Sequence, residues 1–278
     1  VPSRLYREVG LGVQSSNESN RQDFTTNKFV CDFNDNCPEF SETGIVDGVK
    51  GNGPSGNYYR IVNRDSDGHS SIVFDRLIKG AHKAVEIEFD FRIGEHRFNH
   101  HPADGIAVAL VKTDAYGITD PLTMESQVHP KFPRLEDALT VSLATFEERR
   151  IKVNHNGEAD WTTHYNPLLE GSVSGEWQHW RMTVVADGED QLINLWITDH
   201  NDNAYQILED HRVTDYSVGE SRLAFFGKVG ATASNHDLAN ISITYQQEQE
   251  ANVSKTNNTA WTSVGNNENG NDFSTHTE

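Results

Sequence analysis

The chain has 278 residues, enough for one large domain with flexible ends or for two small domains. Its 42 acidic and 23 basic side chains give a net charge of −19, which repels a phosphate backbone or an anionic membrane surface and argues against nucleic acid as a partner. The sequence contains no apolar run of about twenty residues, so we expect no membrane span.

Hydrophobic periodicity predicts an all-β domain of about a dozen strands, arranged as a sandwich or barrel. Residues from Ala84 to Ile93 alternate between apolar and acidic, which is typical of a strand with one buried face. We expect this strand to pair with Ser71–Leu77 across the turn between them. The run Ile106–Lys112 is almost wholly apolar, as in a strand covered on both faces. The remaining predicted strands are Phe29–Phe33, Ile45–Lys50, Tyr58–Asn63, Leu139–Phe146, Arg150–Asn154, His179–Ala186, Gln191–Thr198, Tyr205–Leu208, Arg222–Val229 and Leu238–Tyr245.

An Asp-Gly turn at Asp187 and Gly188 predicts a hairpin between two of these strands. The composition of the two ends indicates three segments. A polar arm at 1–28 precedes a folded sandwich at 29–246, and a tail rich in Asn, Ser, Thr and Glu follows at 247–278. Such a tail is expected to be a linker or disordered unless a partner orders it, so the arm and tail are candidates for contacts with neighbouring subunits.

Three observations bear on whether the protein is extracellular. Cys31 and Cys37 enclose five residues, a spacing that a disulfide can close, although two thiols of a cytosolic protein are the alternative. The chain begins with Val1 and has no signal-peptide pattern, which fits a processed mature chain or an excised fragment. Four N-glycosylation triplets also fit a secreted glycoprotein, at Asn17, Asn240, Asn252 and Asn257.

Three short loops carry oxygen side chains at alternating positions, a spacing that lets a loop wrap a calcium ion. The alternative is that Asp and Asn occur there because they stabilise turns. The candidate ligands are Asp32, Asn34 and Asn36 in the first loop, Asn63, Asp65 and Asp67 in the second, and Asp199, Asn201 and Asn203 in the third.

Several of these segments together resemble the L-type, or legume-like, lectins. The sequence ADGIAVALV, from Ala103 to Val111, resembles the Ala-Asp-Gly strand start of that family. The segment from Arg222 to Tyr245 resembles the family's closing strands, and the alternating strand before ADG falls in the same order. The likeness covers about Phe29 to Tyr245. It implies a concanavalin A-like jelly roll of two antiparallel sheets, with glycans bound at loops above the concave sheet.

The resemblance also implies a set of sugar-binding residues. In the family the Asp of ADG reaches the sugar hydroxyls, and this role carries over to Asp104 with its neighbour Gly105. The loop before the last strand is expected to complete the site. The residues of that loop are Asn235, His236 and Asp237.

The family's metal site is altered in this sequence. The strand that supplies acidic ligands to calcium and a transition metal corresponds to VSLATF, where Ser142 and Ala144 stand at the acidic positions. Only Asn154 and His155 of the family's ligands remain. Because hard cations require several carboxylate or carbonyl oxygens, we expect this metal site to be degraded or moved, with calcium still possible at the Asp and Asn loops.

A second resemblance concerns the first part of the chain. The sequence from Cys31 to Cys37 resembles the opening of MAM domains, and HDLANIS is similar to their closing strand. This likeness implies an extracellular jelly roll in adhesion or assembly. A structural subunit that uses the arm and tail is therefore the alternative to a module that binds glycans or glycoproteins.

An enzymatic interpretation rests on Glu86, Glu88 and Asp90, which share one face of a predicted strand. This pattern resembles the acidic strand of concanavalin A-like glycoside hydrolases, in which paired carboxylates act as nucleophile and acid. A solvated strand face explains the same alternation without chemistry. We therefore expect a non-enzymatic protein, with hydrolysis through Glu86 and Asp90 as the alternative.

Overall fold

The structure is a computed structural model. It describes residues 24–80, 82–94, 102–122, 128–129, 132–133, 135–146, 150–163, 175–230 and 233–248. Within these ranges the chain forms seventeen strands and one short helix, α1 (Thr113–Tyr116). No helix in this part of the chain is long and apolar enough to cross a membrane.

One antiparallel sheet has eight strands, in the order β15-β14-β13-β6-β17-β4-β3, with β1 also paired to β17. Both β4 and β1 pair with β17, β4 at its first residues and β1 at its last. The bounds are β1 (Phe24–Cys31), β3 (Gly48–Lys50), β4 (Tyr58–Val62), β6 (His82–Gly94), β13 (Gln178–Asp187), β14 (Asp190–Thr198), β15 (Ala204–Val213) and β17 (Asn235–Glu248).

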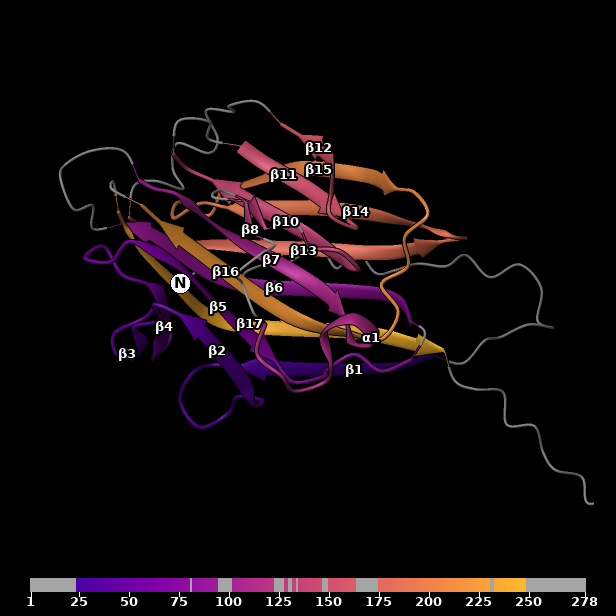
Figure 1. The fold of residues 1–278 in the computed structure, drawn as a ribbon, viewed down its shortest axis with the longest axis horizontal. Helices are drawn as coiled ribbons and strands as arrows, with labels where there is room; N and C mark the ends of the chain where they lie inside the picture. Colours follow the sequence, from indigo (N-terminus) through magenta and orange to yellow (C-terminus); the bar gives the residue numbers. More distant parts are fainter. Residues whose placement is uncertain are drawn as a thin grey trace, which may run out of the picture. The chain divides into compact units, whose positions relative to one another are not determined.

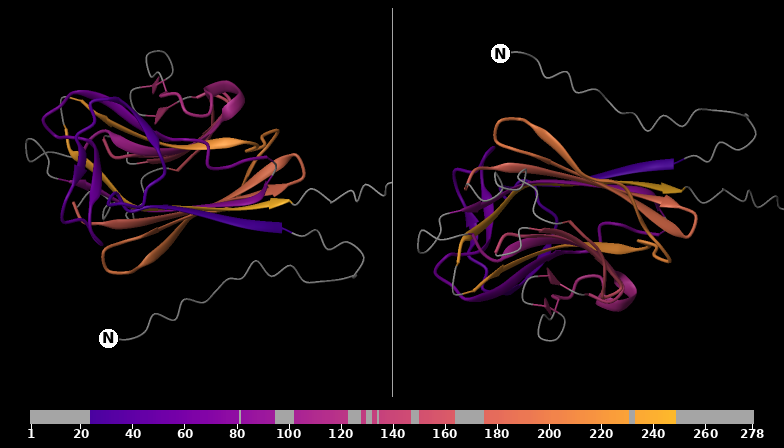
Figure 2. Two further views of the ribbon diagram at one scale, coloured as in Figure 1. Left: turned by 90° about the horizontal axis from the view of Figure 1, so that it is seen from below. Right: turned by 90° about the horizontal axis from the view of Figure 1, so that it is seen from above.

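The second antiparallel sheet has seven strands, in the order β12-β11-β10-β7-β16-β5-β2. Its strands are β2 (Phe40–Gly44), β5 (Gly68–Phe74), β7 (Gly105–Lys112), β10 (Ala138–Ala144), β11 (Arg150–His155), β12 (Glu158–Thr162) and β16 (Ser221–Val229). A two-stranded ribbon, β8 (Val128–His129) with β9 (Phe132–Pro133), belongs to neither large sheet. The two large sheets form separate layers that face each other (Figure 1, Figure 2), which confirms the predicted all-β sandwich.

Strand β6 follows the predicted alternation. Its apolar side chains, from Val85 to Ile93, are fully buried between the sheets, whereas Glu86, Glu88 and Asp90 lie on the outer face. Phe89 contacts both layers, because its ring stacks on Trp180 of β13 at 5.5 Å and meets Phe225 of β16 edge-on at 4.9 Å. Burial of these aromatic rings joins the two sheets through one core.

Strand β7 is buried on both faces, as its unbroken apolar sequence predicts. Ile106, Val108 and Leu110 face the core between the sheets. The residues between them, Ala107 and Ala109, belong to a second cluster on the opposite face of the seven-stranded sheet. That cluster also contains Leu122 and Leu135, which come from the segment after α1, together with Phe226 of β16.

One predicted pairing is wrong. Strand β5 does not pair with β6 across the intervening turn: it pairs with β2 and β16 in the seven-stranded sheet, while β6 pairs with β13 and β17 in the other sheet. The connection between β5 and β6 therefore crosses from one layer to the other. The hairpin at Asp187 and Gly188 is confirmed, because Asp187 pairs with Asp190 and Gly188 has a φ of +68°.

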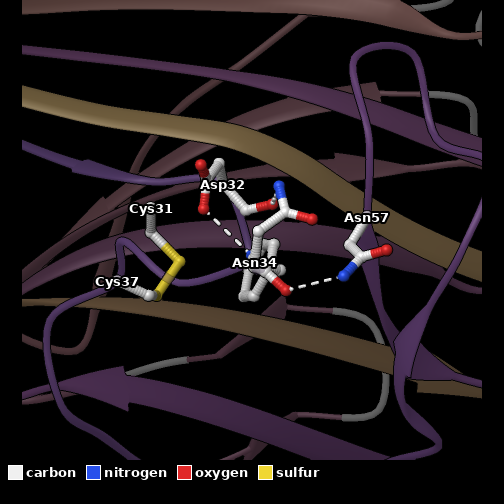
Figure 3. Close-up of a disulfide and its surroundings, with 6 residues drawn as sticks. Cys31, Asp32, Asn34, Cys37 and Asn57 are labelled. Carbon is white, nitrogen blue, oxygen red and sulfur yellow. Dashed lines mark hydrogen bonds between the residues drawn. A yellow bond between two sulfur atoms is a disulfide. The ribbon is translucent and has the colours of Figure 1, made fainter.

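The predicted disulfide joins Cys31 at the end of β1 to Cys37 (Figure 3). Cys31 is buried against the core, so the bond fixes the following loop to the edge of the sandwich. The loop also holds Asn57, whose side-chain amide donates to the Phe33 carbonyl oxygen at 3.1 Å (Figure 3). Strand β1 starts at Phe24, ahead of the expected sandwich boundary, and β17 ends at Glu248.

The packing around Phe89 predicts a large loss of stability in Phe89→Ala. The substitution leaves a cavity between Trp180 and Phe225, so we expect the free energy of unfolding to fall by about 3–5 kcal/mol in urea denaturation. The control is Val49→Ala on β3, whose side chain is 50% exposed and whose loss should cost less than about 0.5 kcal/mol. Similar losses in the two variants would contradict this account of the core.

Candidate functional site

Asp104 lies immediately before β7, between β16 and the end of β10. Its backbone N–H donates to the Lys228 carbonyl oxygen at 2.8 Å. Its own carbonyl oxygen accepts from the backbone N–H groups of Thr145 at 2.8 Å and Phe146 at 3.4 Å. The peptide bond between Ala103 and Asp104 is cis. Asp104 is 9% exposed, so the surrounding segments hold it at the end of the central strand of the seven-stranded sheet with little solvent contact.

Two glycines shape the surroundings of this aspartate. Gly105 has a φ of +152°, and a Cβ on it would lie 2.2 Å from the Leu143 carbonyl oxygen and 3.0 Å from the Ala144 Cα. This close approach of β7 to β10 requires glycine, which explains the Asp-Gly pair in the sequence. A Cβ at Gly230 would lie 3.6 Å from Oδ2 of Asp104, so the carboxylate faces a position without a side chain.

The segment Ser234–His236 lies beside Ala103. The backbone N–H of Ala103 donates to the Ser234 hydroxyl at 3.2 Å, and Nε2 of His236 is 3.0 Å from the Ala103 carbonyl oxygen. The Asn235 side-chain oxygen accepts from the Arg64 backbone N–H at 2.8 Å. The structure thus places His236 against Ala103, the residue before Asp104, whereas the Asn235 side chain bonds to Arg64. Both His236 and Asn235 are buried.

Asp237 lies elsewhere, on the outer face of the eight-stranded sheet. Its buried carboxylate accepts from Arg60 at 2.7 Å and from Arg92 at 2.6 Å. The Arg92 guanidinium in turn lies 4.7 Å from the centre of the Trp177 ring. Strand β17 begins at Asn235 rather than at the predicted Leu238, so the expected binding loop is largely strand. Because successive side chains of a strand point to opposite faces, His236 and Asp237 are separated.

The residues at the family's metal positions do not fit a calcium ion. Ser142 and Asn154 are buried on β10 and β11, and within the described ranges Oγ of Ser142 and Nδ2 of Asn154 have no hydrogen-bond partner. The Ala144 methyl group lies on the same face of the sheet, whereas the His155 ring points to the other face and packs against Tyr216. This set offers no carboxylate, whereas calcium requires several hard oxygen ligands. No three His, Cys, Asp or Glu side chains gather into a metal-binding group among the residues described.

The three Asp and Asn loops use their oxygens to hold their own turns. Asp32 accepts from the Asn34 backbone N–H at 2.9 Å (Figure 3), and Asn63 accepts from that of Asp65 at 2.7 Å. Asp199 accepts from the backbone N–H groups of Asn201 and Asn203 at 2.8 and 2.9 Å. The hydrogen bond from the Asn34 backbone holds the pKa of the Asp32 carboxyl below its ordinary value. Hydrogen bonds from the Asn203 side-chain amide and then from its backbone lower the pKa of Asp199. Such turns account for the spacing, and calcium binding by these loops, including Asp67, stays a prediction.

The acidic face of β6 is neutralised by β13. Arg181 donates to Glu86 at 2.5 and 2.9 Å, while Nδ1 of His179 lies 2.8 Å from Asp90 and its Nε2 lies 3.6 Å from Glu88. The hydrogen bonds with Asp90 and Glu88 raise the pKa of His179 to about 9. The hydrogen bond with His179 lowers the pKa of Glu88, whereas a general acid of a glycosidase requires a raised one.

Asn240, the described member of the four glycosylation triplets, belongs to the same network. Its Nδ2 donates to Asp90 at 2.6 Å, and its Oδ1 accepts from the Ser55 hydroxyl. Glycosylation at Asn240 stays a prediction. The other three triplets, at Asn17, Asn252 and Asn257, lie outside the described residues.

Comparison with solved structures identifies the fold. Peanut lectin bound to a nine-residue peptide matches with a TM-score of 0.57 and 16% identity over 82% of this chain and 100% of that one. Winged bean acidic lectin complexed with methyl-alpha-D-galactose matches with a TM-score of 0.55 and 16% identity, over 81% of this chain and 100% of that one. Lectin II from Ulex europaeus matches with a TM-score of 0.58 and 12% identity, over 80% of this chain and 98% of that one. No protein-family model and no curated protein sequence matches the chain.

The chain therefore has the fold of the legume lectins, a jelly-roll sandwich of two antiparallel sheets. The three structures named above are lectins. The fold that the ADG segment and the closing strands predict is confirmed. The MAM-like opening stays a prediction beyond the disulfide.

The contact at Gly105 predicts that Gly105→Ala destabilises the sandwich. The new Cβ would collide with the backbone of β10, so we expect the free energy of unfolding to fall by roughly 3 kcal/mol. Gly188→Ala is the matched control, since Gly188 also has a positive φ but no atom lies within 4 Å of its added Cβ. It should cost about 1 kcal/mol in the same denaturation experiment. Equal losses would contradict the close approach of β7 to β10.

The network around His179 predicts weaker stability at alkaline pH. The pKa of His179 in the folded protein, about 9, lies above the ordinary histidine value of 6.5. The stabilisation from its protonated form is therefore complete below pH 6.5 and is lost as the pH rises through 9. The full shift corresponds to about 3 kcal/mol. Because the side chain is 39% exposed, solvent screening should reduce the effect to about 1 kcal/mol.

The measurement is the free energy of unfolding of the wild type and of His179→Gln between pH 6 and pH 10. We expect the wild type to be the more stable near pH 6 and the difference to shrink by pH 10. His200→Gln, at an exposed histidine, is the control and should show no such trend. A difference between the wild type and His179→Gln that is independent of pH would contradict the proposed ion pairs.

Proposed function

We propose that this chain is an extracellular carbohydrate-binding module whose site is built around Asp104. The main support is the position of Asp104, which three backbone hydrogen bonds hold between β16 and the end of β10. Further support comes from the fold, which this chain shares with lectins solved with sugars, among them a Bauhinia forficata lectin in complex with GalNAc at 12% identity. At this identity the likeness supports the fold alone, so the site is argued from the residues.

The chemistry of Asp104 suits a sugar. An ionised carboxylate only accepts hydrogen bonds, and sugar hydroxyls donate them, so the two oxygens can bind neighbouring hydroxyl groups. The low exposure of Asp104 strengthens such bonds by limiting competition from water. Oδ2 faces Gly230, where a larger side chain would occupy space close to the carboxylate. The ligand class is therefore a glycan or glycoprotein with at least two adjacent hydroxyls.

Phe146 is a second candidate contact, which the sequence did not single out. It follows Thr145 at the end of β10, and its backbone N–H donates to the Asp104 carbonyl oxygen at 3.4 Å. The side chain is partly exposed. Binding sites for small ligands combine an apolar or aromatic surface with a few polar groups, and Phe146 with Asp104 is such a combination.

The disulfide between Cys31 and Cys37 supports a secreted or cell-surface protein, since such bonds persist in oxidising compartments. The alternative of a structural subunit depends on the arm at 1–28 and the tail at 247–278, of which residues 1–23 and 249–278 lie outside the described residues. It stays a prediction. The hydrolase alternative has less support, because Glu86 and Asp90 are already paired with Arg181 and His179.

Asp104→Asn is predicted to abolish or strongly weaken glycan binding. The amide keeps the size of the side chain but replaces one acceptor with a donor, so we expect at least a tenfold loss of affinity, about 1.4 kcal/mol or more. The measurement is a glycan array followed by calorimetric titration with the best ligand. The control is Asp35→Asn in the exposed disulfide loop, which should bind as the wild type does.

Unchanged thermal unfolding of Asp104→Asn would separate lost binding from lost folding. Two results would overturn the proposal: no glycan retained by the wild-type protein on a broad array, or retained binding in Asp104→Asn. Hydrolysis of β-glucans that disappears in Glu86→Gln would instead support the enzymatic alternative.

A further inference from the structure

We propose that Ser234 and His236 position Asp104 for sugar binding, so that the site forms without a bound cation. The inference deepens the proposed function, because Asp104 is the residue to which that proposal assigns the sugar. It names two positioning residues on β17 and the preceding segment, and it departs from the metal-dependent arrangement that the lectin resemblance implies.

The first argument is the set of contacts around the Ala103–Asp104 peptide. Both polar groups of Ala103 are bonded by the segment before and at the start of β17: the N–H to Ser234 and the carbonyl oxygen to His236. A carbonyl oxygen only accepts, so Nε2 of His236 must carry the proton. Both polar backbone groups of Asp104 are bonded as well, by β16 and by the end of β10. Every backbone polar group of this dipeptide thus has a protein partner.

The second argument is burial. Ser234 and His236 are fully buried, and Ala103 between them is also fully buried. A buried hydrogen bond is protected from water, and a backbone group that loses its partner there has no substitute. The two side chains therefore restrict where Ala103 can lie. Because Asp104 is the next residue, they also restrict where its carboxylate can lie.

The third argument is the chemistry of the position where the resemblance expects the metals. Ser142 and Ala144 replace acidic ligands on β10, and the buried Oγ of Ser142 has no partner among the described residues. A hydroxyl and an amide without a carboxylate are a poor set for a hard cation. The side chains that bond to this dipeptide are instead those of Ser234 and His236, which both contact Ala103.

The test is hydrogen–deuterium exchange of the backbone N–H groups of Asp104 and Thr145 in the full chain, read without any sugar. We compare a sample that contains a chelator with one that contains calcium in about fivefold or greater molar excess. The exchange rates should differ by less than about twofold between the two samples. Ser234→Ala and His236→Leu should accelerate exchange by about tenfold or more. His236→Gln, whose amide N–H can replace Nε2, should stay close to the wild type.

The control is Ser221→Ala, at another buried serine, whose hydroxyl donates to the Val218 carbonyl oxygen at the opposite end of β16. It should leave exchange at Asp104 and Thr145 unchanged. Exchange in β6 reports on the whole sandwich, so a purely structural role for Ser234 and His236 would accelerate it equally. A positioning role accelerates exchange around Asp104 alone. Ser234→Ala keeps the test decisive where His236→Leu fails to fold.

Acceleration by the chelator that calcium reverses would overturn the proposal, and so would wild-type exchange in Ser234→Ala. These outcomes are independent of the proposed function, since no ligand is present. Glycan binding that survives the chelator and weakens at least tenfold in Ser234→Ala supports both. Loss of that binding on chelation would contradict the cation-free site while leaving the carbohydrate-binding function intact.

Discussion

The burial of β7 on both faces is the constraint on which the rest of the structure depends. Its even-numbered residues face the core between the sheets, and its odd-numbered residues face the second apolar cluster. A shift of one residue would exchange the two faces and bring large side chains such as Ile106 to positions that now hold alanine. The register of β7 is therefore fixed, and with it the position of Asp104 at the start of the strand.

The two sheets deal with their outer faces in different ways. The seven-stranded sheet carries a second apolar cluster of the chain's own residues on its outer face, and Asp104 lies at one end of its central strand. The eight-stranded sheet instead carries charged side chains that neutralise one another, with Glu86 beside Arg181 and Asp237 between Arg60 and Arg92. Because these carboxylates are already paired with basic side chains, the face is a poor catalytic site. Its acidic strand suggests catalysis only when the sequence is considered alone.

Local patterns predict much of this fold. The alternation in β6 and the apolar run of β7 identify their buried faces correctly, and the Asp-Gly pair at Asp104 reflects a real backbone contact. Sheet membership is a different matter, because β5 and β6 are neighbours in sequence but lie in opposite layers. Which layer a strand joins depends on distant partners such as β16, and periodicity carries no information about them.

The candidate site is only partly visible in the sequence for a related reason. Asp104 is recognisable from its motif, but the contacts of Ala103 with Ser234 and His236 join residues more than one hundred positions apart. The separation of Asp237 from the site follows from where β17 begins, and strand ends are weakly marked in sequence. Short strands such as β2 and β12 are missed because few residues contribute to their periodicity.

The most direct test of the central claim is an NMR titration of the isotopically labelled chain with a mixture of simple sugars. The account predicts that chemical shifts change for the backbone N–H groups of Gly105, Phe146 and Gly230 and stay constant on the outer face of the eight-stranded sheet. Changes centred on Arg181 and Trp196 of that face, with none near Asp104, would contradict it.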